Sequence, residues 1–142
     1  ASPQNAPASA AAMAVPDQAT LTKLLWSSMA AVDQANKTGN YSVLRDLGSQ
    51  GFQTYNNAAT LAATFADIRT RQIDLSDTLL VAPTYEFAPT MVGPGLLRMR
   101  GRFALRPTAI GFDFIYEWNA GWRLHGVSIM PFDMPRAAAN PR

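Results

Sequence analysis

The sequence predicts a single α+β domain in which three N-terminal helices pack on one face of a curved antiparallel sheet. Apolar residues in the first half of the chain recur every three or four positions, which is the period of a helix. Between residues 96 and 130 they alternate with polar residues, which is the period of a strand. Of the 142 residues, 48% are apolar and 15% are charged, so the chain can form one domain with a substantial core.

The first helix is expected to follow Asp17, a candidate N-cap, and to end at Gly39. A second, short helix is expected between its cap Asn40 and Gly48, because a left-handed residue commonly closes a helix. The third follows Asn57 and runs to about residue 71. The apolar positions that would face the core are Leu21, Leu24, Leu25, Met29 and Val32, then Val43, Leu44 and Leu47, then Leu61, Phe65 and Ile68.

Four strands are expected after the helices. Residues 79–87 are assigned to an edge strand or a bulge, because Pro83 cannot donate a hydrogen bond to a neighbouring strand. Residues 88–95, which are rich in proline and glycine, are assigned to a turn. The other three strands form an antiparallel meander and span residues 96–106, 110–118 and 122–130.

The meander has one aromatic face and one charged face. Keeping the apolar faces together places Trp118 opposite Trp122, Tyr116 opposite Leu124, and Glu117 opposite Arg123. The same rule places Phe103 near Phe112 or Phe114, and Arg100 near Glu117 or Ile115. The charged face would hold Arg98, Arg100, Arg102, Arg123, Asp113, Ile115, Glu117, His125, Val127 and Ile129. Gly101 and Gly126 fall on the aromatic face, where a missing side chain leaves either a bend in the sheet or a hollow.

The composition excludes several kinds of chemistry. The chain has no cysteine and a single histidine, His125, so no disulfide, thiolate nucleophile, metal site or bound cofactor is expected. Its net charge of +2 is too small to predict nucleic-acid binding. No stretch approaches the roughly 18 consecutive apolar residues that a transmembrane helix needs, so no transmembrane segment is expected.

The two ends of the chain differ in composition from the middle. Residues 1–16 carry no charge and consist mostly of alanine, proline and serine, which is typical of a leader or a linker. Such a start fits an exported protein, periplasmic or secreted, whose signal peptide has been removed. The domain is therefore assigned to residues 17–131 and a C-terminal tail to residues 132–142.

Over residues 17–131 the order of these parts resembles the nuclear transport factor 2-like superfamily, the cone-shaped, cystatin-like α+β fold that ketosteroid isomerase and polyketide cyclases share. The resemblance is carried by the segment AVDQANKTGNYSVLRDLGSQGF, by Phe65 in the third helix, and by the closing strands FDFIYEWNAGWRLHGVSI. It implies a pocket for a small apolar molecule between the helices and the concave face of the sheet. It also implies a homodimer formed through the outer sheet face.

The candidate residues follow from this arrangement. The pocket would be lined by Trp26, Phe65, Phe103, Phe112, Phe114, Tyr116 and Leu124. The dimer interface would contain Arg100, Arg102, Ile115, Glu117, Arg123, Val127 and Ile129. No catalytic residue is assigned, because His125 is expected on the charged face and the carboxylates that could enter the pocket, Asp33, Asp67, Asp74 and Asp77, form no evident acid–base pair.

The sequence therefore favours a non-enzymatic binding or protein-interaction domain of an exported bacterial-type protein, with a possible small apolar ligand in the cone. The alternative is an isomerase, dehydratase or cyclase that acts on a hydrophobic small molecule, which would need Asp33 or Asp67 to reach the pocket. A third possibility is an anion-binding surface formed by the arginines of the sheet.

Overall fold

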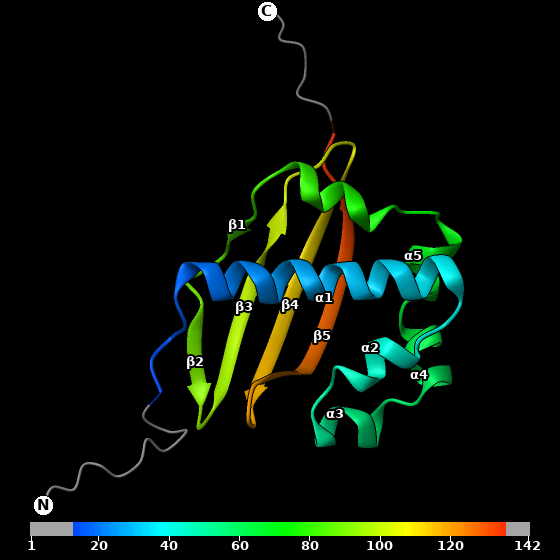
Figure 1. Cartoon of the computed structure of the whole chain (residues 1–142). Coiled ribbons are helices and arrows are strands. Elements are labelled where there is room, and N and C mark those ends of the chain that lie inside the picture. The colour runs from blue at the N-terminus through cyan, green and yellow to red at the C-terminus, as the bar shows by residue number, and fades with distance from the viewer. Residues whose placement is uncertain (1–12, 136–142) are drawn as a thin grey trace, which may run out of the picture.

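A computed structural model describes residues 13–135 and shows an α+β arrangement, with one long helix lying across an antiparallel sheet (Figure 1). The helical elements are α1 (Gln18–Thr38), α2 (Ser42–Asp46), α3 (Gln50–Tyr55), α4 (Ala58–Thr64), α5 (Ala66–Thr70) and the 3-10 helix η3 (Leu75–Leu80). The strands are β1 (Thr84–Tyr85), β2 (Thr90–Gly93), β3 (Leu96–Phe103), β4 (Thr108–Trp118) and β5 (Trp122–Asp133). Figure 1 shows α1 crossing one face of the sheet and α2 to α5 gathered beside β5.

Helix α1 begins and ends as the sequence predicts. The Asp17 side chain accepts a hydrogen bond of 2.9 Å from the Thr20 N–H, and Gly39 closes the helix with a φ of 77°. The closing conformation is left-handed, which glycine adopts without the steric cost of a Cβ. The buried face of α1 consists of Leu21, Leu25, Ser28, Met29, Val32, Asp33 and Ala35.

The segment between α1 and the sheet is more broken than expected. The three helices of the prediction are replaced by α1, four short α-helices and η3. Asn57 caps α4 as predicted, but Phe65, at φ −104° and ψ 14°, interrupts the helix that was expected to continue to about residue 71. Helix α3 was not predicted; its N-cap is Ser49, whose Oγ accepts from the Phe52 N–H at 3.1 Å.

Gly48 does not have the left-handed conformation that was expected of it. The left-handed residues of the described chain are Gly39, Gly95, Gly121, Gln72 and Ala120. At Gly48 an added Cβ would lie 2.2 Å from the Phe52 ring, so the glycine permits close packing rather than a turn.

Residues 75–95 also differ from the prediction. Where a strand from residue 79 was expected, Asp74 caps η3 by accepting from the Ser76 N–H at 3.0 Å, and the Thr78 hydroxyl donates to the Leu75 carbonyl. These local bonds favour a helical turn over an extended chain. Strand β1 is only two residues long, and β2 lies inside the segment that was assigned to a turn.

The sheet has the order β1-β3-β4-β5, and β2 also pairs with β3. Three predicted pairs are confirmed: Trp118 with Trp122, Tyr116 with Leu124, and Glu117 with Arg123. The Phe103 and Phe112 ring centroids lie 5.3 Å apart, as expected. The prediction for Arg100 was wrong, because the residue opposite it is Asp113.

A β-bulge at His125 reverses the predicted faces of the rest of β5. Ile115 pairs with Gly126 while Tyr116 pairs with Leu124, so His125 is an extra residue without a partner on β4. Past the bulge Val127 lies opposite Phe114 and Ile129 opposite Phe112, which places both on the aromatic face and corrects the predicted charged face. Gly126 lies on the opposite face, beside Ile115.

Most of the predicted leader, 1–16, and of the predicted tail, 132–142, lies outside residues 13–135, so their assignments and export stay predictions. Strand β5 extends to Asp133, two residues past the predicted end of the domain. Within residues 13–135 no helix is both long and apolar enough to span a membrane.

Gly101 lies against a neighbouring strand rather than beside a hollow. An added Cβ would lie 2.3 Å from the Thr84 carbonyl oxygen and 2.8 Å from the Tyr85 Cα, whereas at Gly126 it would lie 3.5 Å from the Ile115 side chain.

We therefore expect Gly101→Ala to lower the free energy of unfolding by roughly 1–3 kcal/mol, because β1 must move away. Urea denaturation measures this change. Gly126→Ala is the matched control, and an equal loss in both variants would contradict the close approach of β1.

Candidate functional site

The seven predicted pocket residues belong to one hydrophobic core. Ring centroids are 5.1 Å apart for Trp26 and Phe103, 5.6 Å for Phe112 and Phe114, and 6.3 Å for Phe114 and Tyr116, which are contact distances for aromatic rings. Trp26 is partly buried, and the other six are at most 3% exposed. This geometry favours a filled core over the ligand pocket that the resemblance implies.

Tyr116, the polar member of this set, is bound to α1. Its hydroxyl donates to the Leu24 carbonyl at 3.0 Å, so the 2.6 Å bond to Ser28 has the serine hydroxyl as donor. Burial raises the pKa of Tyr116 well above its ordinary value of 10. Tyr116 thus joins the sheet to the helix as a neutral phenol.

Three of the four candidate carboxylates make bonds elsewhere, and the fourth is exposed. Asp33 is buried, and its oxygens accept from the Leu75 N–H at 3.1 Å and from Lys37 at 2.9 Å. Asp74 caps η3, while Asp67 is exposed and paired with Arg71. The remaining one, Asp77, lies in the first turn of η3 and is exposed. None of these bonds directs a carboxylate toward the aromatic rings.

His125 faces the helical layer and not the charged face, because the bulge turns it toward α3. Its Nδ1 shares a hydrogen bond of 2.8 Å with the Oγ of Ser49, a buried side chain that also caps α3. The Ser49 N–H donates to the Leu124 carbonyl at 2.8 Å, so the contact lies at the edge of β5. These bonds give His125 a structural role in joining α3 to the sheet.

The outer face of the sheet is the side that α1 does not cover (Figure 1). Arg98 donates two hydrogen bonds to Asp113, at 3.0 and 2.6 Å, and Arg100 reaches both Asp113 at 3.0 Å and Glu86. The hydrogen bonds from Arg98 lower the pKa of Asp113 below its ordinary value. This network accounts for two of the arginines that were considered as an anion site.

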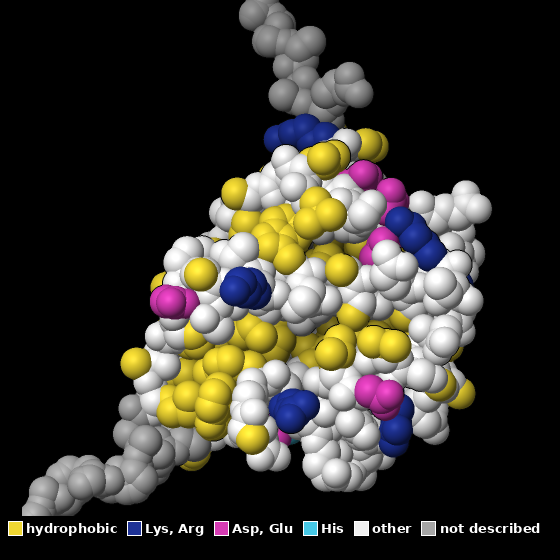
Figure 2. Space-filling model, in the orientation of Figure 1, with side chains coloured by type: hydrophobic (Ala, Val, Ile, Leu, Met, Phe, Trp, Pro, Cys, Tyr) yellow, Lys and Arg dark blue, Asp and Glu magenta, His cyan; other side chains and the backbone are white. Residues whose placement is uncertain are grey.

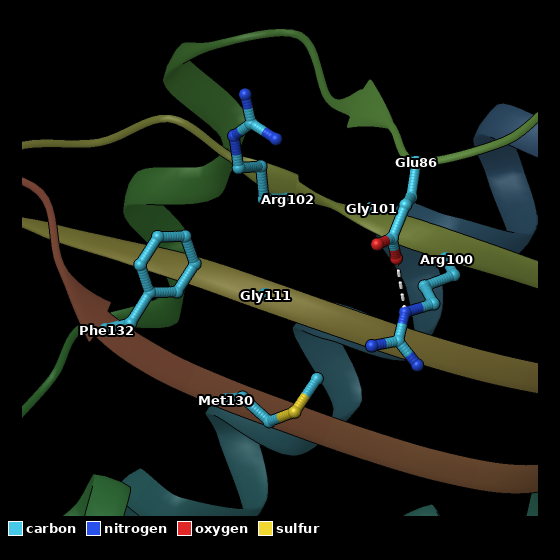
Figure 3. A pocket seen from close by; sticks show the side chains of 7 residues that line it. All are labelled: Glu86, Arg100, Gly101, Arg102, Gly111, Met130 and Phe132. Carbon is cyan, nitrogen blue, oxygen red and sulfur yellow. Dashed lines mark hydrogen bonds and ion pairs between the residues drawn. The ribbon is translucent and has the colours of Figure 1, made fainter.

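Beside the network the outer face has a depression of about 350 Å³, shown in Figure 3. Gly111 forms its floor between Arg102 on β3 and Met130 on β5, and the Phe132 ring lies beside it. Met130 and Phe132 are each 41% exposed, which is unusual for such large apolar side chains. Neither was predicted for this face, because strict alternation was assumed across the bulge; the change of apolar positions from Trp122 and Leu124 to Val127 and Ile129 is the signal in the sequence that could have shown it.

Five of the seven predicted interface residues lie on the outer face: Arg100, Arg102, Ile115, Glu117 and Arg123. The other two, Val127 and Ile129, pack against the core instead, which corrects the predicted set. Within residues 13–135 Arg102 and Glu117 make no ion pair. The outer face therefore combines a satisfied charge network, exposed apolar side chains and free charges.

The bonds of Tyr116 predict a stability that depends on pH. We expect Tyr116→Phe to lower the free energy of unfolding by about 1 kcal/mol at pH 8. Because the folded pKa of Tyr116 lies above the unfolded one, the contribution of the phenol is complete below pH of about 10 and is lost at higher pH. Urea unfolding of both proteins at pH 8 and pH 11 tests this. A difference that grows at pH 11 would contradict the buried neutral phenol.

The charge network predicts the opposite dependence. We expect Asp113→Asn to cost roughly 1–2 kcal/mol near pH 7, because Arg98 loses a charged acceptor on a partly exposed face. The lowered pKa of Asp113 means that its contribution is present above the unfolded value of about 4 and is lost as the pH falls. Thermal unfolding from pH 7 to pH 2 should show the two proteins converging. A difference unchanged at pH 2 would contradict the ionic origin.

Residues 13–135 contain no group of three His, Cys, Asp or Glu side chains placed to hold a metal ion. Comparisons of the chain with protein families, with curated proteins and with solved structures find no significant match.

Proposed function

We propose that this chain is a non-enzymatic protein-interaction domain that binds a second copy of itself through the outer face of its sheet. The observation that carries the proposal is the combination, on that face, of the exposed apolar side chains of Met130 and Phe132 with Arg102 and Glu117, which have no ion pair among the described residues. An interface needs an apolar centre that excludes water and a charged rim that selects the partner.

The charges favour a second copy over a strongly acidic or basic partner. The outer face carries arginines and acidic residues in nearly equal number: Arg98, Arg100, Arg102 and Arg123 with Glu86, Asp113 and Glu117. Arg102 lies beside Gly111, and Glu117 lies about 20 Å farther along β4. A two-fold axis perpendicular to the strands brings the Arg102 end of one copy over the Glu117 end of the other. Such a face is complementary to itself.

Other functions find less support in the geometry. The enzyme alternative needs Asp33 or Asp67 in the pocket, and both carboxylates are held elsewhere by the bonds described above. An anion site on the arginines competes with Asp113 and Glu86, which occupy Arg98 and Arg100. The order of helices and strands is compatible with a cone-like fold. We include membership of the nuclear transport factor 2-like superfamily in the proposal. Export is also included, and it rests on the composition of residues 1–16.

Substitution at the centre of the outer face tests the proposal. Ile115 lies on this face beside Gly126, next to the charge network. We expect the unsubstituted chain to have the mass of a dimer in size-exclusion chromatography with light scattering. Ile115→Glu should shift the mass to that of a monomer, because its carboxylate would be buried in the interface while Arg98, the residue opposite it, is already bound to Asp113.

Leu80→Glu is the matched control, because Leu80 is 76% exposed on η3, away from the outer face. This variant should remain dimeric, and circular dichroism should show that both variants are folded. A monomeric unsubstituted chain at concentrations on the order of 100 µM, or a folded Ile115→Glu variant that stays dimeric, would overturn the proposal.

A further inference from the structure

A second cleft, of about 340 Å³, lies on the helical side of the molecule, apart from the outer sheet face. The last turns of α1 form one wall, and α5 with the segment that follows it forms the other. Its lining residues are Asp33, Asn36, Lys37, Ile68, Arg69, Gln72, Ile73 and Asp74. Figure 2 shows acidic and basic side chains next to one another near this end of α1. The cleft therefore joins charged and apolar groups in a small volume.

The Asn36 side chain has a buried donor without a partner. Arg69 donates to the Tyr41 hydroxyl at 2.6 Å, so the single proton of that hydroxyl is directed to the Asn36 Oδ1. This chain of bonds fixes the orientation of the amide and leaves Nδ2 facing away from Tyr41. Nδ2 is buried and has no acceptor among the described residues. A buried donor without an acceptor is destabilising, so an acceptor that reached Asn36 Nδ2 would stabilise the site.

A second donor lies beside this amide. Arg69 uses Nη1 for Tyr41 and for the Ala62 carbonyl at 3.2 Å, while Nε and Nη2 have no partner among residues 13–135. Arg69 and Asn36 both bond the Tyr41 hydroxyl and both line this cleft. Two unused donors, one of them cationic, suit the two oxygens of a carboxylate.

The other charges of the cleft are already paired. Lys37 reaches Asp33 at 2.9 Å and Asp74 at 2.8 Å, and its hydrogen bond lowers the pKa of Asp74 to about 2. Asp33, Lys37, Asp74 and Arg69 together sum to zero charge. Arg69 makes no ion pair among residues 13–135 and lies at the same end of the cleft as Asn36, away from the excess negative charge of Asp33 and Asp74, so this end is the one that suits an anionic ligand.

The apolar part of the cleft fits a short hydrocarbon chain. Ile68 and Ile73 line it, and the left-handed Gln72, at a φ of 56°, comes directly before Ile73. The Ile73 N–H donates to the Ile68 carbonyl at 3.1 Å and the Gln72 N–H to the Arg69 carbonyl at 3.0 Å, which is the pattern of a helix closed by a left-handed residue. Glycine is the usual residue there, and the glutamine instead gives the rim of the cleft an amide side chain.

We infer that this cleft is a binding site for a small carboxylate with a short branched apolar chain, held by Asn36 and Arg69 against Ile68 and Ile73. The ligand carboxylate accepts from Asn36 Nδ2 and from the free guanidinium N–H groups of Arg69. Because Nδ2 is covered, binding includes a small side-chain movement at the rim, where Arg69 and Gln72 are exposed. The site is independent of the outer sheet face and of the dimer proposed for it.

The probe for this site is 4-methylpentanoate, with 4-methylpentanamide as the uncharged analogue. In a ¹⁵N-resolved NMR titration of the full chain we expect the side-chain amide signal of Asn36 to shift, with a Kd on the order of 1 mM. The uncharged analogue should bind about tenfold more weakly, because it loses the charged hydrogen bonds to Arg69.

Three variants distinguish binding in this cleft from binding at another basic surface. Asn36→Leu removes the unpartnered donor, and Arg69→Gln removes the cation; each should weaken binding about tenfold. Arg71→Gln is the matched control on the same segment, because Arg71 pairs with Asp67 and does not line this cleft, and it should leave the Kd unchanged. If Asn36→Leu does not fold, the Kd of Arg69→Gln decides whether the probe binds in this cleft. Arg69 is exposed, so its substitution is expected to leave the fold intact.

The inference is overturned if no Asn36 signal shifts with probe at concentrations of about 20 mM, well above the expected Kd. It is also overturned if the shifts fall on Arg98 to Arg102 of the outer face, or if Arg71→Gln weakens binding as much as Arg69→Gln does. A monomeric mass in light scattering would overturn the proposed dimer but would not change the titration results for the cleft. The two proposals can therefore fail independently of each other.

Discussion

The packing of α1 across the aromatic face of β3, β4 and β5 is the contact on which the rest of the structure depends. The buried stripe of α1 and the rings of Phe103, Phe112 and Phe114 form one hydrophobic cluster. A cluster of this size is the main source of stability in a chain without disulfides. Among the described residues, the hydrogen bonds between α1 and the strands are those of the Tyr116 hydroxyl with Leu24 and Ser28. The rings contact one another under α1, and this geometry favours a filled core at that place.

The bulge at His125 controls how the short helices beside β5 attach to the sheet. One extra residue in β5 turns the imidazole toward α3, where Ser49 binds it, and the Ser49 and Leu124 backbones bond to each other across the same edge. The same insertion moves Val127 and Ile129 into the core and brings Met130 to the outer face. A single local irregularity thus sets both the position of the small helices and the chemistry of the exposed surface.

The two candidate surfaces differ in the state of their charges. On the outer face Asp113 is shared by Arg98 and Arg100, while Arg102 and Glu117 at its ends have no ion pair in the described chain. In the cleft beside α1, Lys37 is shared by two carboxylates, while Asn36 and Arg69 keep unused donors. Paired charges mainly stabilise the fold, whereas unpaired ones are available to a partner or a ligand. This difference separates the structural residues from the candidates for binding.

The sequence by itself determined the features that depend on neighbouring residues. Helix α1, with Asp17 and Gly39 at its ends, and the register of the Trp118–Trp122 hairpin follow from capping and from alternation, which are local rules. The aromatic identity of the core follows in the same way. The α+β class could therefore be predicted without coordinates.

Only the tertiary structure decided what depends on residues distant in the chain. The bulge at His125 places the imidazole against Ser49, 76 positions earlier, and one inserted residue reverses every later side chain of β5. Gly101 is explained by the approach of β1, and Gly48 by the Phe52 ring. The free amide of Asn36 exists because Arg69 and Tyr41 meet beside it. Alternation and spacing carry no information about such tertiary contacts, because they describe only the order of residues along the chain.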